Sequence, residues 1–241
     1  ETSLKTNPME VSVVGDFDMD SVIKLAAKYL GTLSLSTQVY QSSESRLPEF
    51  PAGQFYKIPV VTKIPKGMVI VAYPTGGLWN ISRTRRLSVL ADIVSDRLRD
   101  QIREKLGSAY STFAFNRPSR AYPEYGVFQT GVSINPEEAN MLVNKIKKIV
   151  SGLVADGTAQ DELHRALSPT LTSIKELMRT NNYWLNTVLT GSKKHPQQLD
   201  WSRTIMKDYA SVTKEEVSDT AKKYLDNEKA ATIIVKPNSD K

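Results

Sequence analysis

Short apolar runs and runs in which apolar and polar residues alternate recur along this chain, and both kinds predict β-strands. The alternating runs, at 110–115 and 126–134, predict strands with one buried face. The strands predicted in this way cover residues 9–14, 55–64, 68–74, 110–115, 126–134 and 231–235. In the fourth of these, Phe113 and Phe115 share one face, whereas Tyr110 and Thr112 share the other, more polar face. Tyr110 is therefore predicted on the side of its strand where a ligand could contact it.

Apolar residues spaced three and four apart predict helices between these strands. The clearest stripe of this kind consists of Leu87, Leu90, Ala91, Val94, Leu98, Ile102 and Leu106, with Gly107 as the predicted C-terminal cap. The other predicted helices cover residues 21–30, 136–154, 158–174, 183–189, 201–209 and 214–225. Asn135 is predicted to cap one of them, Thr213 and Glu216 form a capping box for the last, and Pro169 predicts a kink or break.

The region between the first helix and the next strand is rich in serine and proline and has little periodicity, as is typical of a linker. The chain is accordingly divided into a strand-helix tail at 1–35, a linker at 36–53 and a main domain at 54–241. A faint repeat relates Ala26-Ala-Lys-Tyr-Leu30 to Ala221-Lys-Lys-Tyr-Leu225.

Composition places the chain among globular proteins, because 241 residues with 40% hydrophobic content can bury a sizeable core. The apolar runs have the length of strands, so no membrane span is predicted. The chain has no cysteine, which excludes disulfides and thiolate metal ligands from it. It begins with Glu1 and has no basic-then-apolar leader, so any targeting signal is expected to have been removed or to lie outside this sequence.

Most of the net charge of +6 lies between residues 81 and 120, a segment that contains nine basic and four acidic residues. Such a cluster could attract an acidic ligand or nucleic acid. The favoured interpretation is a solvated helix face laced with acids at helical spacing. Nucleic-acid binding is the weaker alternative, because the region has no helix-turn-helix, no known RNA-binding motif and no aromatic residues interleaved with its arginines.

A metal site built from this chain alone is not expected. The two histidines, His164 and His195, form no chelating pair, and no His-x-x-Glu-His or His-Glu-x-x-His motif is present. Asp16, Asp18 and Asp20 have the spacing that opens a calcium loop, but the turn glycine and the bidentate glutamate of such a loop are missing. Turn and helix-cap roles are therefore favoured for these aspartates.

Arg103 and Tyr110, seven residues apart, are the candidate functional residues. Arginine offers a charged fork and tyrosine a neutral donor, and both kinds of group can polarise a peptide carbonyl and hold an oxyanion. Neither can activate water at neutral pH, so a base and a metal would come from elsewhere. The spacing alone favours structural roles, in which Arg103 pairs with Asp100 or a helix-end carbonyl and Tyr110 packs on a sheet.

Residues 98–111, LRDQIREKLGSAYS, resemble the Leu-Arg-Glu-x-x-Gly-x-x-Tyr-Ser segment in the C-terminal half of pitrilysin and insulinase-type zinc peptidases, the inverzincins. Residues 13–18, VVGDFD, and the helix after them are similar to the family's segment that ends one homologous domain before the next begins. Residues 120–126, the helix from Pro136 and residues 158–163 match the later part of such a domain. The sequence of these segments most resembles that of bacterial insulinase-like zinc proteases.

The resemblance implies an α+β fold, with an antiparallel sheet, helices mainly on one face, and the tail of a preceding homologous domain in residues 1–35. In the family the N-terminal domain binds zinc through an inverted His-x-x-Glu-His motif, while the C-terminal domain supplies an arginine and a tyrosine that bind the substrate backbone. Those two roles carry over to Arg103 and Tyr110. Because the zinc motif is absent here, the resemblance implies zinc on an N-terminal half or partner subunit, a peptide substrate, and no cleavage by this chain alone. It also favours a periplasmic location.

A different class of function stays open, because domains of this fold also serve as non-catalytic structural or interaction subunits. A His-x-x-Glu-His motif in the rest of the protein would indicate an enzyme, and its absence would indicate a scaffold.

Overall fold

The computed structural model describes residues 9–33, 47–103 and 111–238, with the side chain of Arg103 left out. The chain divides into two compact units. One consists of Glu1–Arg46 with Thr172–Met206, and the other of Leu47–Leu171 with Lys207–Lys241.

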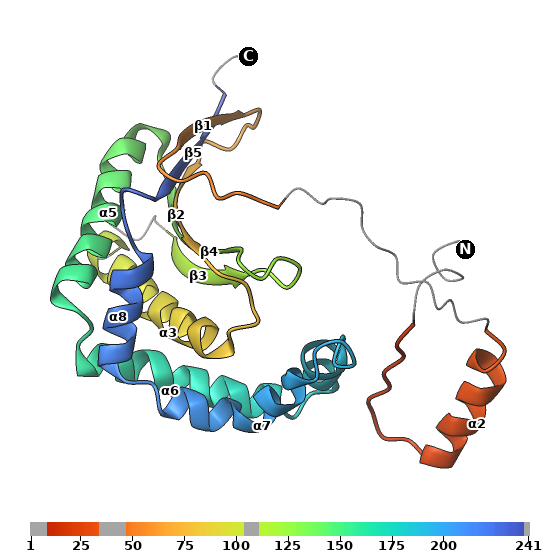
Figure 1. The fold of residues 1–241 in the computed structure, drawn as a ribbon. Helices are drawn as coiled ribbons and strands as arrows, with labels where there is room; N and C mark the ends of the chain where they lie inside the picture. The colour runs from red at the N-terminus through yellow and green to blue at the C-terminus, as the bar shows by residue number, and fades with distance from the viewer. Residues whose placement is uncertain (1–8, 34–46, 104–110, 239–241) are drawn as a thin grey trace. The chain divides into compact units, whose positions relative to one another are not determined.

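The second unit is built on a five-stranded sheet (Figure 1). Its strands are β1 (Phe55–Val60), β2 (Gly67–Thr75), β3 (Thr112–Pro118), β4 (Gly126–Ile134) and β5 (Ala231–Pro237). They lie in the order β1-β5-β2-β4-β3, and every neighbouring pair is antiparallel except β1 and β5, which run parallel. The predicted α+β class is confirmed, and the antiparallel sheet carries one parallel pair at an edge.

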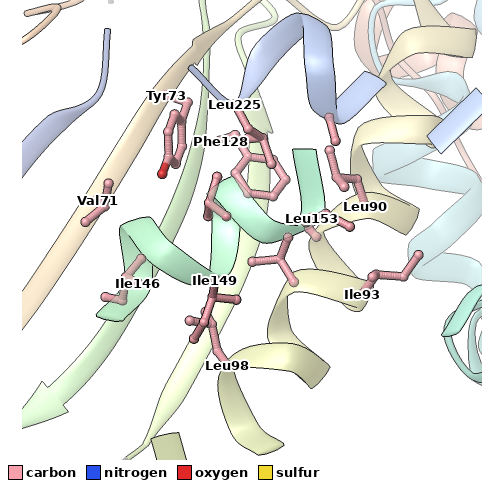
Figure 2. Close-up of a cluster of buried hydrophobic side chains, with 14 of the residues drawn as sticks. Val71, Tyr73, Leu90, Ile93, Leu98, Phe128, Ile146, Ile149, Leu153 and Leu225 are labelled. Carbon is pink, nitrogen blue, oxygen red and sulfur yellow. The ribbon is translucent and has the colours of Figure 1, made fainter. Parts of the chain in front are cut away.

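Three helices cover one face of this sheet, namely α3 (Ile81–Leu98), α5 (Ala139–Asp156) and α8 (Lys214–Tyr224) (Figure 1). Apolar side chains of β2 and β4 meet them in a buried core (Figure 2). Its members include Val71, Tyr73, Leu90, Ile93, Leu98, Phe128, Ile146, Ile149, Leu153 and Leu225. Full burial of each such side chain contributes about 1.5–3 kcal/mol, so this core fixes α3 and α5 on the sheet.

The predicted stripe on α3 is buried, because Leu87, Leu90, Leu98 and Ile102 are fully covered. The regular α-helix ends at Leu98, and the chain continues as a π-helical turn, η1 (Arg99–Arg103). A π turn has wider hydrogen-bond spacing than the α-helix and is often found at functional sites. Leu106 and the predicted cap Gly107 lie outside the described residues.

The helix predicted at 136–154 begins with a 3₁₀ turn, η2 (Pro136–Glu138), before α5. Asn135 is the N-cap residue of this turn and Pro136 follows it, as predicted, but the Asn135 side chain makes no capping hydrogen bond. Instead the Glu138 N–H donates to the backbone oxygen of Asn135 at 3.0 Å, as the tighter turn requires. Gly157, with φ of 77°, ends α5 as predicted.

Helix α6 (Gln160–Leu177) includes Pro169 and continues through it, so the proline does not break the helix. The capping box of α8 is confirmed. The Glu216 N–H donates to Thr213 Oγ1 at 3.2 Å, and the Thr213 N–H donates to Glu216 Oε2 at 3.1 Å.

The first unit contains α2 (Met19–Leu30), the π-helical η3 (Tyr183–Leu189) and the start of α7 (Gln197–Ala210). The strand predicted at residues 9–14 is wrong, since these residues are not in a strand. A strand forms only by pairing with a neighbour, and this apolar run pairs with no strand in the described part of the chain.

The division into 1–35, 36–53 and 54–241 concerns homologous domains rather than compact units, and it stays a prediction. Among the helices of the described ranges, none combines the length and the apolar character needed to cross a bilayer.

Candidate functional site

Arg103 is the last residue of η1, at the end of the helix that begins with α3. Its side chain and the whole of Tyr110 lie outside the described residues. Strand β3 starts at Thr112, two residues after Tyr110. Whether Arg103 and Tyr110 approach one carbonyl therefore stays a prediction, whereas the helix and the strand on either side of them are described in detail.

Ser95 connects that helix to that strand. Its Oγ accepts a hydrogen bond from the Ala114 N–H at 2.8 Å and lies 3.2 Å from the Ala114 carbonyl oxygen, to which it donates. Strand β3 is an edge strand. The bonds from Ser133 N–H to Ser111 O and from Ser119 N–H to Tyr125 O show that odd-numbered positions along it exchange backbone hydrogen bonds with β4. The backbone of Ala114 therefore points to the free edge, where Ser95 satisfies both of its polar groups.

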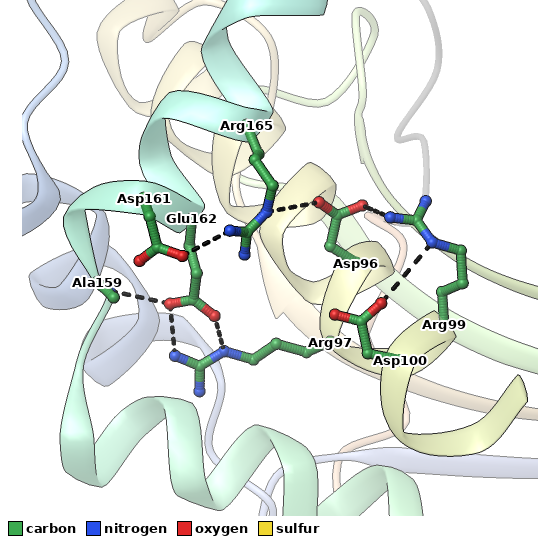
Figure 3. A network of polar contacts seen from close by, with 8 residues as sticks. All are labelled: Asp96, Arg97, Arg99, Asp100, Ala159, Asp161, Glu162 and Arg165. Atoms are coloured by element: carbon green, nitrogen blue, oxygen red, sulfur yellow. Dashed lines mark hydrogen bonds and ion pairs between the residues drawn. The ribbon is translucent and has the colours of Figure 1, made fainter. Parts of the chain in front are cut away.

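A bidentate ion pair joins α3 to α6 (Figure 3). Arg97 donates to both carboxylate oxygens of Glu162, at 2.6 and 2.8 Å, and to the Gly157 carbonyl at 2.9 Å. The side chains of Arg97 and Glu162 are only 18% and 14% exposed. Glu162 also accepts a hydrogen bond from the Ala159 N–H at 2.9 Å. This pair fixes the last turns of α3 against the start of α6.

Burial and hydrogen bonding shift the pKa of the Glu162 carboxyl in opposite directions. Burial raises the pKa of this carboxyl, but the hydrogen bonds from Arg97 and Ala159 outweigh it and hold the pKa below its ordinary value. The ionised pair is therefore the stable form at neutral pH.

The outer part of the network is weaker (Figure 3). Arg165 lies 2.5 Å from Asp161 and 3.9 Å from Asp96, and Arg99 lies 2.8 Å from Asp96 and 3.9 Å from Asp100. The two arginines are about half exposed. Exposed pairs of this kind contribute about 0–1 kcal/mol, so they add little to the buried pair.

Other members of the basic cluster are also neutralised inside the second unit. Arg85, only 4% exposed, pairs with Asp208, and Arg86 pairs with Glu216. The acids that face the arginines thus come from α6, α7 and α8 as well as from α3 itself. Much of the cluster is explained by contacts that hold these helices together.

No set of three or more His, Cys, Asp or Glu side chains that could hold a metal occurs in the described ranges. His164 lies on α6 with its Nε2 3.5 Å from Ser168 Oγ, and His195 lies in the loop before α7. The cap role favoured for the aspartates is confirmed for Asp18, which accepts from the Ser21 N–H at 2.7 Å at the start of α2. Hydrogen bonds from the Ser21 side chain and N–H hold the pKa of Asp18 below its ordinary value.

Sequence reasoning did not find Ser95 or the partners of Arg97. A serine within a helix is ordinary, and the acid that meets Arg97 lies 65 residues away in the chain. Nothing in local spacing could have paired them.

A profile of the family described as "Peptidase M16 inactive domain" matches residues 2–169. Among curated proteins, the chain is similar to the chloroplastic stromal processing peptidase of Oryza sativa subsp. indica, with 25% identity over 224 residues that cover 73% of this chain and 18% of that protein. It is also similar to the probable zinc protease PqqL of Haemophilus influenzae, with 24% identity over 164 residues, or 68% of this chain and 17% of that protein. The chain thus spans less than a fifth of the length of these relatives.

Among solved structures, a protease from Helicobacter pylori superposes with a TM-score of 0.79 and 15% identity. The match covers 93% of this chain and 54% of that one. At this identity the likeness concerns the fold.

Proposed function

Because this chain belongs to the M16 peptidase family and carries the inactive domain of that family, we propose that it is the substrate-binding portion of a zinc-dependent endopeptidase. Its substrates would be peptides or unfolded proteins. The names of the similar proteins, a processing peptidase and a probable zinc protease, support this proposal. The family match over residues 2–169 is the observation that carries it.

The zinc ion would be held outside this chain. The described residues supply no ligand set for it, so an N-terminal half of the same protein or a partner subunit would contribute the metal site. Bound there, zinc would polarise the scissile carbonyl as a Lewis acid. The part of this chain is to bind and orient the substrate.

Arg103 and Tyr110 are the residues proposed for that part. A guanidinium and a phenol that donate to the carbonyl oxygen of the substrate would bind it more strongly as negative charge develops there. Arg103 ends a helix fixed by the core and by Glu162, and Tyr110 precedes a strand fixed by β4 and Ser95. Such fixed supports are what a preorganised donor pair needs.

A non-catalytic structural or interaction subunit is the second candidate, favoured by the match to a domain that is itself described as inactive. The remaining coding sequence distinguishes the two. A His-x-x-Glu-His motif in it would support the peptidase, and its absence would support the subunit.

Tyr110→Phe in the intact protein tests the proposed role directly. Loss of one oxyanion donor should lower kcat about 100-fold while the enzyme stays folded. Tyr29→Phe, at a tyrosine that is 64% exposed on α2, is the matched control and should leave kcat unchanged. Peptide cleavage followed by fluorescence would measure both, and an unchanged kcat for Tyr110→Phe would refute the carbonyl role.

A further inference from the structure

We infer that Ser95 is a positioning residue, which holds the helix that ends in Arg103 against the strand that follows Tyr110. This inference rests on the proposed function and adds to it a residue that contacts no substrate. It assigns to the hydroxyl of Ser95 the task of fixing the helix that carries Arg103 against strand β3.

The contact itself is unusual for a serine within a helix. Such a hydroxyl commonly bonds back to its own helix, as Ser88 does one heptad earlier by donating to the Thr84 carbonyl at 3.0 Å. Ser95 instead uses both its donor and its acceptor capacity on one residue of another element, Ala114. A two-bond contact restrains both the distance and the angle between α3 and β3.

The position of this contact in the sheet strengthens the restraint. Ala114 presents its backbone to the free edge of β3, so no sheet hydrogen bond competes with Ser95 there. On its other side β3 is paired with β4 over its full length. The strand therefore cannot adjust to a shift of the helix without losing bonds on one side or the other.

The contact lies on the two elements that flank the segment from Arg103 to Tyr110 in the chain. Arg103 follows Ser95 by eight residues along a helical segment, and Tyr110 precedes Ala114 by four residues. The buried pair of Arg97 and Glu162 holds the same end of α3 from the side of α6. Because a misplacement of about 1 Å can cost a hundredfold in rate, loss of the Ser95 contact should lower the benefit that Arg103 gives.

The experiment is a double-mutant cycle in the intact zinc peptidase, with Ser95→Ala and Arg103→Ala made singly and together. Ser95→Ala should lower kcat about tenfold with little change in KM. In the Ser95→Ala background, Arg103→Ala should then cost several-fold less in kcat than it costs in the unmodified enzyme. Ser88→Ala, on the same helix, is the control, and Arg103→Ala should keep its full cost in that background.

Equal costs of Arg103→Ala in the Ser95→Ala and Ser88→Ala backgrounds would overturn the positioning role while leaving the proposed function intact. No cost of Arg103→Ala in any background would overturn the proposed function and this inference with it. If Ser95→Ala does not fold, Ser95→Cys keeps a side chain of similar shape with a weaker donor and acceptor. It should show the same reduced cost of Arg103→Ala to a smaller degree, and an undiminished cost would overturn the inference.

Discussion

Glu162 combines low exposure with three hydrogen bonds, two from Arg97 and one from the Ala159 N–H. A buried carboxylate of this kind is stable only while its partners remain, because an unpaired buried charge carries a large desolvation cost. The individual residue therefore determines whether α3 and α6 stay together at this point.

Glu162→Gln should lower the free energy of unfolding of the chain by about 1–3 kcal/mol at pH 7, since Arg97 loses a charged acceptor. Asp161→Asn is the control, because Asp161 is 69% exposed and pairs with Arg165 on the surface, and it should change stability little. Urea denaturation measures both. Equal stabilities of the two variants would contradict the importance of the buried pair.

The same pair predicts a pH dependence. The folded-state pKa of Glu162 is lowered, so its contribution is present above the ordinary glutamate pKa of about 4.3 and is lost as the pH falls through the folded value. The difference in stability between the unmodified chain and Glu162→Gln should therefore shrink in acid. A difference that stays constant down to pH 3 would show that ionisation of Glu162 does not matter.

At the scale of elements, strands β3 and β4 pack closely where Gly131 lies opposite the ring of Phe113. A Cβ at Gly131 of β4 would clash with the ring of Phe113 on β3. Phe113 in turn stacks on Phe115, with ring centroids 5.3 Å apart. The position of the Phe113 ring thus depends on the absence of a side chain at Gly131.

Gly131→Ala should destabilise the chain by about 1 kcal/mol, because the half-buried ring of Phe113 must move away from the new methyl group and disturb its stack on Phe115. Gly152→Ala is the matched control. It lies within α5, and a Cβ there would meet its nearest atom at 4.0 Å, so alanine should stabilise the helix by about 0.5–1 kcal/mol. Thermal unfolding measures both, and a Gly131→Ala variant as stable as the unmodified chain would contradict the described packing.

Elements with a strong local pattern were predictable from the sequence, and those set by distant contacts were not. The alternation over β4 and the apolar stripe of α3 gave nearly the observed elements, because one face of each is buried in the same core. The parallel pairing of β1 with β5 joins segments far apart in the chain, and local periodicity carries no information about it. Residues 9–14 have a composition typical of strands, but they pair with no strand in the described part of the chain, so the prediction of a strand there was wrong.

The candidate site was predictable to a smaller extent. Arg103 and Tyr110 came from the resemblance of residues 98–111 to one peptidase segment, and their role stays a prediction. The contact of Ser95 with Ala114 could not be predicted from the sequence, because the Ser95 hydroxyl could equally have bonded to its own helix, as that of Ser88 does.

At the scale of the whole molecule, the function proposed from the family match divides substrate binding and metal binding between two parts. This chain would hold the substrate and a zinc-bearing part would supply the metal. The chain covers 18% of the length of the similar processing peptidase. An experiment on the whole molecule therefore supplies the proposed zinc-bearing part separately.

Reconstitution of peptide cleavage from the two parts tests this central claim most directly. The chain alone, with zinc added, should not cleave a fluorogenic peptide, whereas addition of the zinc-bearing half should give cleavage that a chelator abolishes. Arg103→Ala in this chain should lower the reconstituted kcat about 100-fold. Chelator-sensitive cleavage by this chain alone, or full reconstituted activity with Arg103→Ala, would contradict the account.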